Sequence, residues 1–278
     1  MHFTFAAETD IGITKDTNQD SILVKHGKYK NNEILMAVIC DGMGGLSKGE
    51  LASATVINEF EKWFNNELPK EIAKSEANKK IVGSRDSKHN KEDEKLGVDI
   101  DLEVIGGKWE LMLKELNIKI AQYSKKEGIT MGTTFTGVLF IGNSYVVAHV
   151  GDTRLYHISN TVKQITSDQT FIAREIKKGT MTPEQAKKDK RRNLLLQCVG
   201  ASDVVEPEVI AGKTEKGNYM LCSDGFRHEI SDKEIKEYLN PKKLKDKKAM
   251  SSNIKYLIEL NKQRNEKDNI SAVLIKVE

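Results

Sequence analysis

The carboxylate of Asp41 stands where an apolar run of strand length, residues 34–40, ends. Gly42 follows it. A glycine lets the backbone approach a ligand and expose its own carbonyl, so the pair can offer two kinds of oxygen to a hard cation. An Asp-Gly pair is also a common turn former, and taken alone this one favours the turn.

Acidic residues occupy the same kind of position at three further places. Asp224 and Asp152 follow apolar runs, and Asp268 stands just before the apolar run 270–277. In an antiparallel sheet, carboxylates that follow three strands and precede a fourth can all lie at one edge. We therefore expect these aspartates and Asp41 to meet in the folded chain.

The donor atoms of such a cluster decide which metal it would hold. The four aspartates supply only oxygen, and no histidine or cysteine lies beside them at ligand spacing. This excludes a typical structural zinc site and favours Mg²⁺ or Mn²⁺. Two such ions about 3.5–4 Å apart can hold a bridging water, lower its pKa and clamp a phosphoryl group during in-line displacement. The predicted reaction is phosphoester hydrolysis with a metal-activated water as nucleophile.

Composition limits the setting of this chemistry. With 278 residues and no Pro- or Gly-rich divider, one domain is the economical prediction. Charged residues make up 31% of the chain, yet its net charge is only +3, and no long apolar run or signal-like start is present. We expect a cytoplasmic protein without a membrane segment, whose cysteines are buried free thiols: Cys40, Cys198 and Cys222.

Two clusters rich in Lys and Arg, at 187–192 and 242–248, raise the question of nucleic-acid binding. Neither is interleaved with aromatic residues, and no nucleic-acid module signature is visible. Solvated faces are the better interpretation, and no nucleic-acid partner is expected.

Periodicity predicts the elements that must position the acids. Apolar residues at helical spacing predict helices after residue 45, around 109–123 with Gly128 as the stop, and around 250–258. Residues 131–140 and 144–150 predict a hairpin whose strands are apolar at nearly every position, so the sheet needs cover on both faces. Residues 168–196 are predicted to form a helical excursion, a segment with helices that lies outside the strands. Residues 65–108 are predicted to be a polar insertion that includes a mobile loop at 83–95.

These blocks together resemble one family, the metal-dependent type 2C serine/threonine protein phosphatases, in the compact form common in bacteria. The resemblance runs nearly end to end and leaves out only 65–108. Its motifs are Asp10-Ile11-Gly12, Asn18-Gln19-Asp20-Ser21, Asp41-Gly42-Met43-Gly44-Gly45, Gly49-Glu50-Leu51-Ala52-Ser53, Met131-Gly132-Thr133-Thr134, Ala148-His149-Val150-Gly151-Asp152-Thr153-Arg154, Leu221-Cys222-Ser223-Asp224-Gly225 and Asp268-Asn269-Ile270-Ser271.

The resemblance implies an α+β fold. Two antiparallel β-sheets would pack as a central β-sandwich, with α-helices on both sides, in four layers. Residues 1–278 would form a single catalytic domain, in which 168–196 align with the mobile flap that influences substrate access beside the family's active site.

The resemblance also assigns roles to the acids. Asp41 would bridge two Mn²⁺ or Mg²⁺ ions and the carbonyl of Gly42 would bind one of them. Asp224 and Asp268 would hold the other, and Asp152, together with Asp224, matches the place of a weaker third ion. In the same way, Asp20 would be an acid close to the metal-bound waters.

Three positions depart from the family pattern. Lys15 stands where the family usually has Arg, and a Lys point charge cannot reproduce the bidentate grip of Arg on phosphate, so weaker substrate binding is expected. Gln19 replaces a frequent Glu and removes one negative charge. Met43 stands where eukaryotic members carry a histidine proposed as general acid, so leaving-group protonation would fall to water or another group.

The resemblance implies a monomeric phosphatase that hydrolyses phosphoserine and phosphothreonine in proteins and opposes a partner Ser/Thr kinase. Two alternatives stay open. The first is a non-catalytic regulator that keeps the fold, for which Lys15 and Gln19 are the only support. The second is a phosphatase of a small phosphorylated metabolite, which shares the chemistry but not the substrate.

Overall fold

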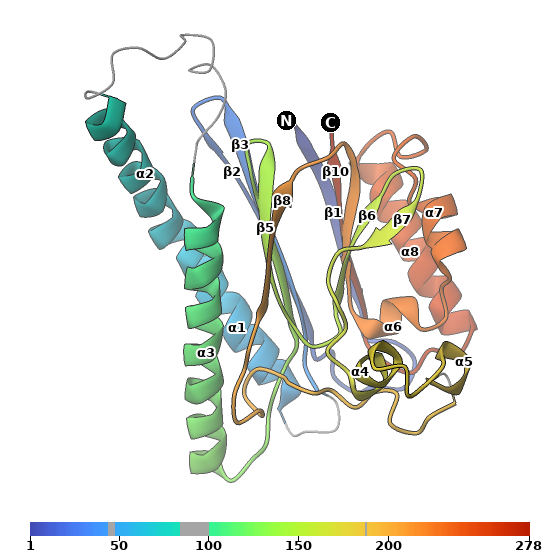
Figure 1. The fold of residues 1–278 in the computed structure, drawn as a ribbon. Helices are drawn as coiled ribbons and strands as arrows, with labels where there is room; N and C mark the ends of the chain where they lie inside the picture. The colour runs from blue at the N-terminus through green and yellow to red at the C-terminus, as the bar shows by residue number, and fades with distance from the viewer. Residues whose placement is uncertain (44–47, 84–99, 187) are drawn as a thin grey trace.

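Two five-stranded antiparallel sheets form the middle of the molecule (Figure 1). The structure, a computed structural model, describes residues 1–43, 48–83, 100–186 and 188–278. In order across the first sheet, the strands are β1 (Phe3–Asp10), β10 (Ile270–Val277), β9 (Gly217–Cys222), β6 (Arg154–Ile158) and β7 (Val162–Gln164). The second sheet contains β2 (Asp20–Tyr29), β3 (Asn32–Asp41), β4 (Phe135–Ile141), β5 (Ser144–Val150) and β8 (Glu208–Lys213).

Helices cover the outer face of each sheet (Figure 1). The second sheet carries α1 (Gly49–Lys62), a π-helical turn (Trp63–Glu67), α2 (Leu68–Gly83) and α3 (Leu102–Glu127). The first sheet carries α6 (Asp224–Arg227), α7 (Asp232–Tyr238) and α8 (Lys247–Gln263), and the short helices α4 (Phe171–Lys177) and α5 (Pro183–Ala186) lie at one end of the sandwich.

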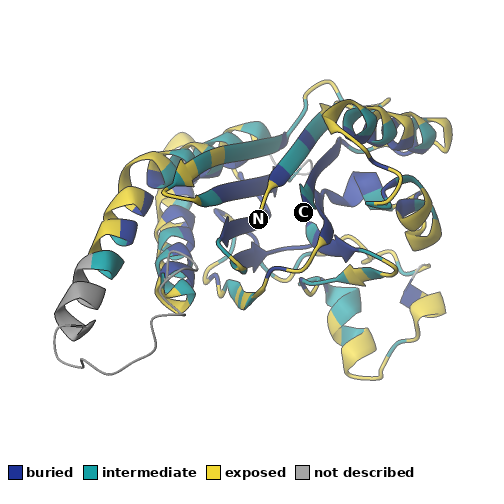
Figure 2. Cartoon of the chain, turned by 90° about the horizontal axis from the view of Figure 1, so that it is seen from above, coloured by how far each residue is buried: buried dark blue, intermediate teal, exposed yellow. Residues whose placement is uncertain are grey.

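Strand β3 shows why these strands are apolar at every position. Its side chains alternate between two apolar layers: Met36 and Val38 pack under the helices, whereas Leu35 and Ile39 pack against the first sheet. Both faces of this strand are therefore buried, and Figure 2 shows the buried colour along inner strands of the sandwich. The four-layer α+β arrangement expected from the sequence is confirmed.

The two strands at the ends of the sequence lie side by side. Strand β1 pairs with β10 from Phe3 opposite Val277 to Asp10 opposite Ile270. Because β10 is also paired to β9, it occupies the interior of its sheet. This places Asp268, just before β10, beside the end of β9.

The helix stop predicted at Gly128 is confirmed, and further capping signals mark other helix ends. Gly128 ends α3 in a left-handed conformation with φ of 65°, and Gly179 follows α4 with φ of 73°. The Thr182 hydroxyl and the Gln185 side chain exchange hydrogen bonds with each other's backbone at α5. Ser231 begins α7 with a full capping box.

Several boundaries differ from the sequence prediction. Strand β4 begins at Phe135 rather than near 131. Among the described residues of the excursion 168–196, only α4 and α5 are helical, while 194–196 lie antiparallel beside 169–171. The two short helices bury few side chains, and backbone hydrogen bonds between 169–171 and 194–196 hold the segment together instead.

The polar segment 65–108 is helical at both ends. Helix α2 continues from α1 and buries Leu68 and Ile72, and α3 begins at Leu102. Lys and Glu favour helices even where an apolar stripe is thin. Most of the loop expected at 83–95 lies outside the described residues.

The three cysteines are buried and free, as expected. No helix in the described part of the chain is both long and apolar enough to cross a membrane.

Candidate metal centre

Asp41 is the last residue of β3, and its backbone is tied to the start of β4. Its N–H donates to the Thr134 hydroxyl over 2.9 Å, and its carbonyl accepts from the Thr134 N–H over 2.8 Å. The Thr133 hydroxyl donates to the same carbonyl over 2.9 Å. These bonds fix Asp41 at the rim of the second sheet.

Asp224 and Asp268 are brought together because β9 and β10 are neighbours. The Ser223 N–H donates to the Ser271 carbonyl over 3.1 Å, and the Ser271 N–H donates to the Ser223 hydroxyl over 3.0 Å. Gly225 then packs against the backbone of the segment that carries Asp268, where a Cβ would lie 2.2 Å from the Asn269 carbonyl oxygen. Only glycine permits this approach.

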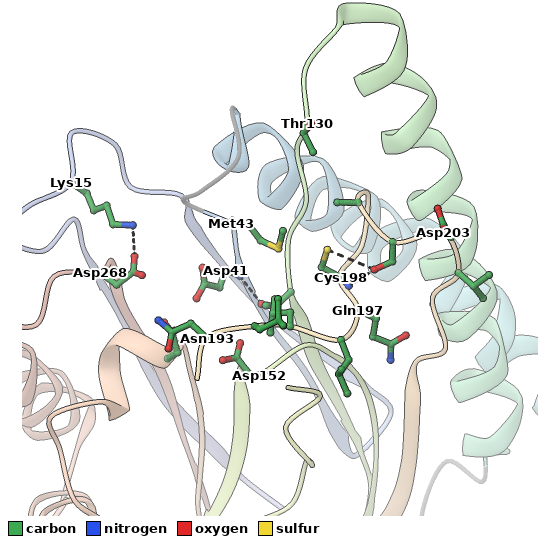
Figure 3. A pocket seen from close by; sticks show the side chains of 18 residues that line it. Lys15, Asp41, Met43, Thr130, Asp152, Asn193, Gln197, Cys198, Asp203 and Asp268 are labelled. Carbon is green, nitrogen blue, oxygen red and sulfur yellow. Dashed lines mark hydrogen bonds and ion pairs between the residues drawn. The ribbon is translucent and has the colours of Figure 1, made fainter. Parts of the chain in front are cut away.

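All four aspartates expected at one edge line a single cavity of about 900 Å³ (Figure 3). Asp41 ends β3 of the second sheet, Asp224 and Asp268 lie next to β9 and β10 of the first, and Asp152 lies in the loop between β5 and β6. Lys15 shares the cavity with them.

The carboxylates in and beside the cavity repel one another. Burial, followed by the charges of Asp20 and Asp224, raises the pKa of Asp41 well above its usual range. Burial raises the pKa of Asp20 to about 7, with Asp224 and Asp268 adding to the shift and the hydroxyls of Ser223 and Ser271 opposing it.

Several carboxylate oxygens near the cavity have no protein donor of good geometry. Oδ1 of Asp224 has no hydrogen-bond partner, and neither side-chain oxygen of Asp20 has one of good geometry, although the Ser223 and Ser271 hydroxyls lie close enough to favour its charged form. Buried, unpaired anionic oxygens are what a hard divalent cation would satisfy, so the donor set fits one. No three His, Cys, Asp or Glu side chains in the described ranges already stand in a metal-binding arrangement.

Lys15 supplies positive charge to the cavity. Its Nζ lies 2.8 Å from Oδ1 of Asp268. Burial opposes protonation of Lys15, but the bond to Asp268 and the charge of Asp41 outweigh it and raise the pKa of the amine. Lys15 thus neutralises one of the aspartates expected to hold a metal.

Asp152 differs from the other acids because a buried arginine binds it. Arg227 Nη2 lies 3.2 Å from Oδ2 of Asp152, donates to its carbonyl over 3.1 Å, and lies 3.7 Å from Oδ2 of Asp168. Arg154 grips Asp168 at 2.7 and 2.6 Å. Burial and the charge of Asp224 nevertheless raise the pKa of Asp152 to about 7, although Arg227 opposes the shift.

After Arg227, His228 is the second basic neighbour of the aspartates that the sequence analysis missed. Its Nε2 lies 3.4 Å from Oδ2 of Asp224 and its Nδ1 lies 3.1 Å from Oε2 of Glu266. Burial disfavours the imidazolium, but Glu266 and Asp224 together raise the pKa of His228. The signal was the pair of basic residues Arg227-His228 directly after the Asp224 motif.

The family model for protein phosphatase 2C matches residues 13–275. The chain belongs to the protein phosphatase 2C family. It is 28% identical to the serine/threonine protein phosphatase PstP of Mycobacterium tuberculosis over 98% of this chain, and it spans 45% of that relative's length.

Solved structures of family members share the fold. The serine/threonine phosphatase Stp1 of Staphylococcus aureus has 26% identity and a TM-score of 0.76, with 100% of this chain and 96% of that one covered. The catalytic domain of PstP in complex with two manganese ions has 27% identity and a TM-score of 0.68, with 99% of this chain and 97% of that one covered.

The phosphatase 2C glycine motif after Asp41 is partly described. The Gly42 N–H donates to the Gln19 carbonyl over 3.1 Å, and a Cβ on Gly42 would lie 2.5 Å from the Gly49 carbonyl oxygen. The Gln19 side chain donates to Glu50 over 3.3 Å, and Met43 lines the cavity. Gly44 and Gly45 lie outside the described residues.

The raised pKa of Asp20 predicts how pH affects stability without metal. A carboxyl whose pKa rises from about 3.9 in the unfolded chain to about 7 in the folded one holds its proton more tightly when folded. Its contribution to stability is therefore lost as pH rises from about 4 to about 7. In EDTA, we expect Asp20→Asn to melt at a higher temperature than the wild type, by a margin that grows between about pH 5 and pH 7.5.

The control for that experiment is saturating Mn²⁺, which is expected to raise the wild-type melting temperature more at the higher pH, where the carboxylates are charged. A margin that stays constant across the two pH values would show that Asp20 is ionised in both states.

Proposed function

We propose that the chain is a Mn²⁺- or Mg²⁺-dependent protein serine/threonine phosphatase. The observation that supports this most is the cavity lined by Asp41, Asp152, Asp224 and Asp268 in a phosphatase 2C fold. The PstP catalytic domain, 27% identical, binds two manganese ions, which supports the same stoichiometry here.

The residues proposed to hold the ions are Asp41, the Gly42 carbonyl, Asp224 and Asp268. When bound, the ions would lower the pKa of a shared water and neutralise charge on the phosphoryl oxygens. Asp20 offers two buried oxygens that can accept hydrogen bonds from water near Asp41 and Asp224. Once the Asp268 carboxylate binds a cation, Lys15 would leave its ion pair with Asp268 and bind the substrate phosphate instead.

We also propose that residues 1–278 act as one catalytic domain, because both sheets contribute to a single inner core. Residues 168–196 would be its flap and 65–108 its insertion. The substrates would be phosphoserine and phosphothreonine proteins produced by a partner Ser/Thr kinase, and the protein would act as a cytoplasmic monomer.

The test is direct. Purified protein is expected to hydrolyse p-nitrophenyl phosphate and a phosphothreonine peptide with Mn²⁺ and not with EDTA. A saturable heat of Mn²⁺ binding in calorimetry, without turnover, would instead favour a non-catalytic binding protein. Turnover that a small phosphorylated metabolite outcompetes would favour the metabolite phosphatase.

Lys15→Ala is expected to raise the KM for p-nitrophenyl phosphate about tenfold, with a smaller change in kcat, because a charged hydrogen bond to phosphate is lost. Steady-state kinetics measure both parameters. Lys267→Ala, an exposed lysine next to Asp268, serves as control and should match the wild type. An unchanged KM with a reduced kcat would show that Lys15 acts in the chemical step rather than in substrate binding.

Arg227 predicts that a third ion at Asp152 binds weakly, because its carboxylate already has a cationic partner. Calorimetry should give two tight Mn²⁺ sites, and Arg227→Gln should raise the affinity of the third about tenfold. Arg154→Gln removes a guanidinium that binds Asp168 in the same network. This variant should not raise the affinity of the third ion. Equal third-site affinities in all three proteins would contradict the competition.

A further inference from the structure

Three exposed aliphatic side chains line the cavity that holds the aspartates. Leu194, Leu196 and Val204 expose 51%, 43% and 67% of their surface. Single exposed leucines are ordinary on a protein surface, but a group of them in one cavity marks a binding surface. None of the three has a polar group that could serve the metal or the phosphate.

Backbone hydrogen bonds tie the segment of Leu194 and Leu196 to residues 169–171. The Phe171 N–H donates to the Leu194 carbonyl and the Leu196 N–H donates to the Gln169 carbonyl, each over 2.8 Å. Side chains two residues apart on an extended chain point to the same side, so Leu194 and Leu196 stand together while Leu195 is less exposed. An exposed apolar pair on a backbone held by hydrogen bonds loses little entropy when it is covered.

The cavity that holds the aspartates adjoins a second one, and the two form a groove. A second cavity of about 640 Å³ shares Leu196, Gln197 and Val204 with the first. Figure 3 shows the direction of this groove, with Lys15 and Asp268 on one side of Asp41 and with Gln197 and Asp203 on the other. A phosphate group between the aspartates would fill only a part of it.

We propose that Leu194, Leu196 and Val204 form a subsite for an aliphatic side chain of a phosphoprotein substrate, located about one to three residues from the phosphorylated residue in an extended peptide. The proposal rests on the proposed function and adds a sequence preference to it. Because the groove is continuous with the aspartate cavity, we expect its occupant to be part of the same peptide chain that carries the phosphate.

The experiment uses phosphothreonine peptides in which a single leucine is moved through the flanking positions of an alanine host, with serine at the same position as reference. With Mn²⁺, the wild type is expected to show a leucine-to-serine ratio of kcat/KM of about tenfold at one position. Leu196→Ser and Val204→Ser are each expected to reduce that ratio toward one. Because it is a ratio within one protein, general damage to the variant cancels.

Leu111→Ser is the matched control, since Leu111 is 61% exposed on α3 and does not line either cavity. It should keep the wild-type ratio. The proposal is overturned if no position gives a ratio above about twofold, or if the preference survives both cavity substitutions. Wild-type protein that hydrolyses no substrate would refute the proposed function, and leucine-dependent peptide binding by fluorescence polarisation would then decide the subsite by itself.

Discussion

Asp224→Asn is expected to lower Mn²⁺-dependent turnover of p-nitrophenyl phosphate on the order of a thousandfold, while the protein stays folded. The substitution keeps the shape of the side chain and removes its charge. Loss of a charged ligand worth several kcal/mol of transition-state stabilisation corresponds to a rate loss of this size. Stability should be kept, because Asp224 adds its charge to the repulsion that acts on Asp41 and Asp20.

The matched control for this variant is Asp203→Asn, which removes the same charge from an exposed position of the same cavity. Turnover should stay within about twofold of the wild type, because an exposed charge acts through screened solvent. Melting temperature and Mn²⁺ calorimetry accompany the kinetics. Full turnover in Asp224→Asn would remove this residue from the proposed metal set, and loss of turnover in Asp203→Asn would mean that bulk charge matters more than ligation.

Gly225→Ala is expected to affect both stability and activity. The added Cβ would lie 2.2 Å from the Asn269 carbonyl oxygen, a backbone atom that cannot rotate away, and 3.3 Å from Cβ of Asp268. Relief of this clash has to separate α6 from the start of β10, which moves Asp224 away from Asp268. The free energy of unfolding should fall by about 1–3 kcal/mol, and Mn²⁺ affinity should fall with it.

Gly107→Ala makes the same chemical change but is expected to raise, not lower, the free energy of unfolding. Gly107 lies inside α3, and a Cβ there would meet nothing within 4 Å. Alanine in a helix interior is favoured over glycine by about 0.5–1 kcal/mol, so this variant should become more stable by that amount. Urea denaturation of both variants measures the two changes. A Gly225→Ala protein as stable as the wild type would show that the segments around residues 225 and 269 can separate without loss.

The sequence predicted the strands and the common position of the acids because both follow from short-range patterns. Residues 34–40 are apolar at every position, and that pattern is stable only where both faces of a strand are covered, as they are in β3. Asp41 ends that strand, so its position at the rim follows from the strand's length.

Contacts made by long polar side chains could not be predicted in this way. Lys15 meets Asp268 across more than 250 residues of sequence, and Arg227 reaches back to Asp152. Their partners depend on how loops pack once the sheets have formed, which no local period records. The helical character of α2 was missed for a different reason, because Leu68 and Ile72 form too thin an apolar stripe to be distinguished from a polar linker.

The pairing of β1 with β10 has a consequence for synthesis on the ribosome. Strand β1 is made long before its neighbour β10, and contacts between such distant segments form slowly. A nascent chain that lacks β10 has unpaired edges on both β1 and β9, which are sites for aggregation or chaperone capture. The aspartate cluster is therefore completed only after β10 has been made and has paired with its neighbours.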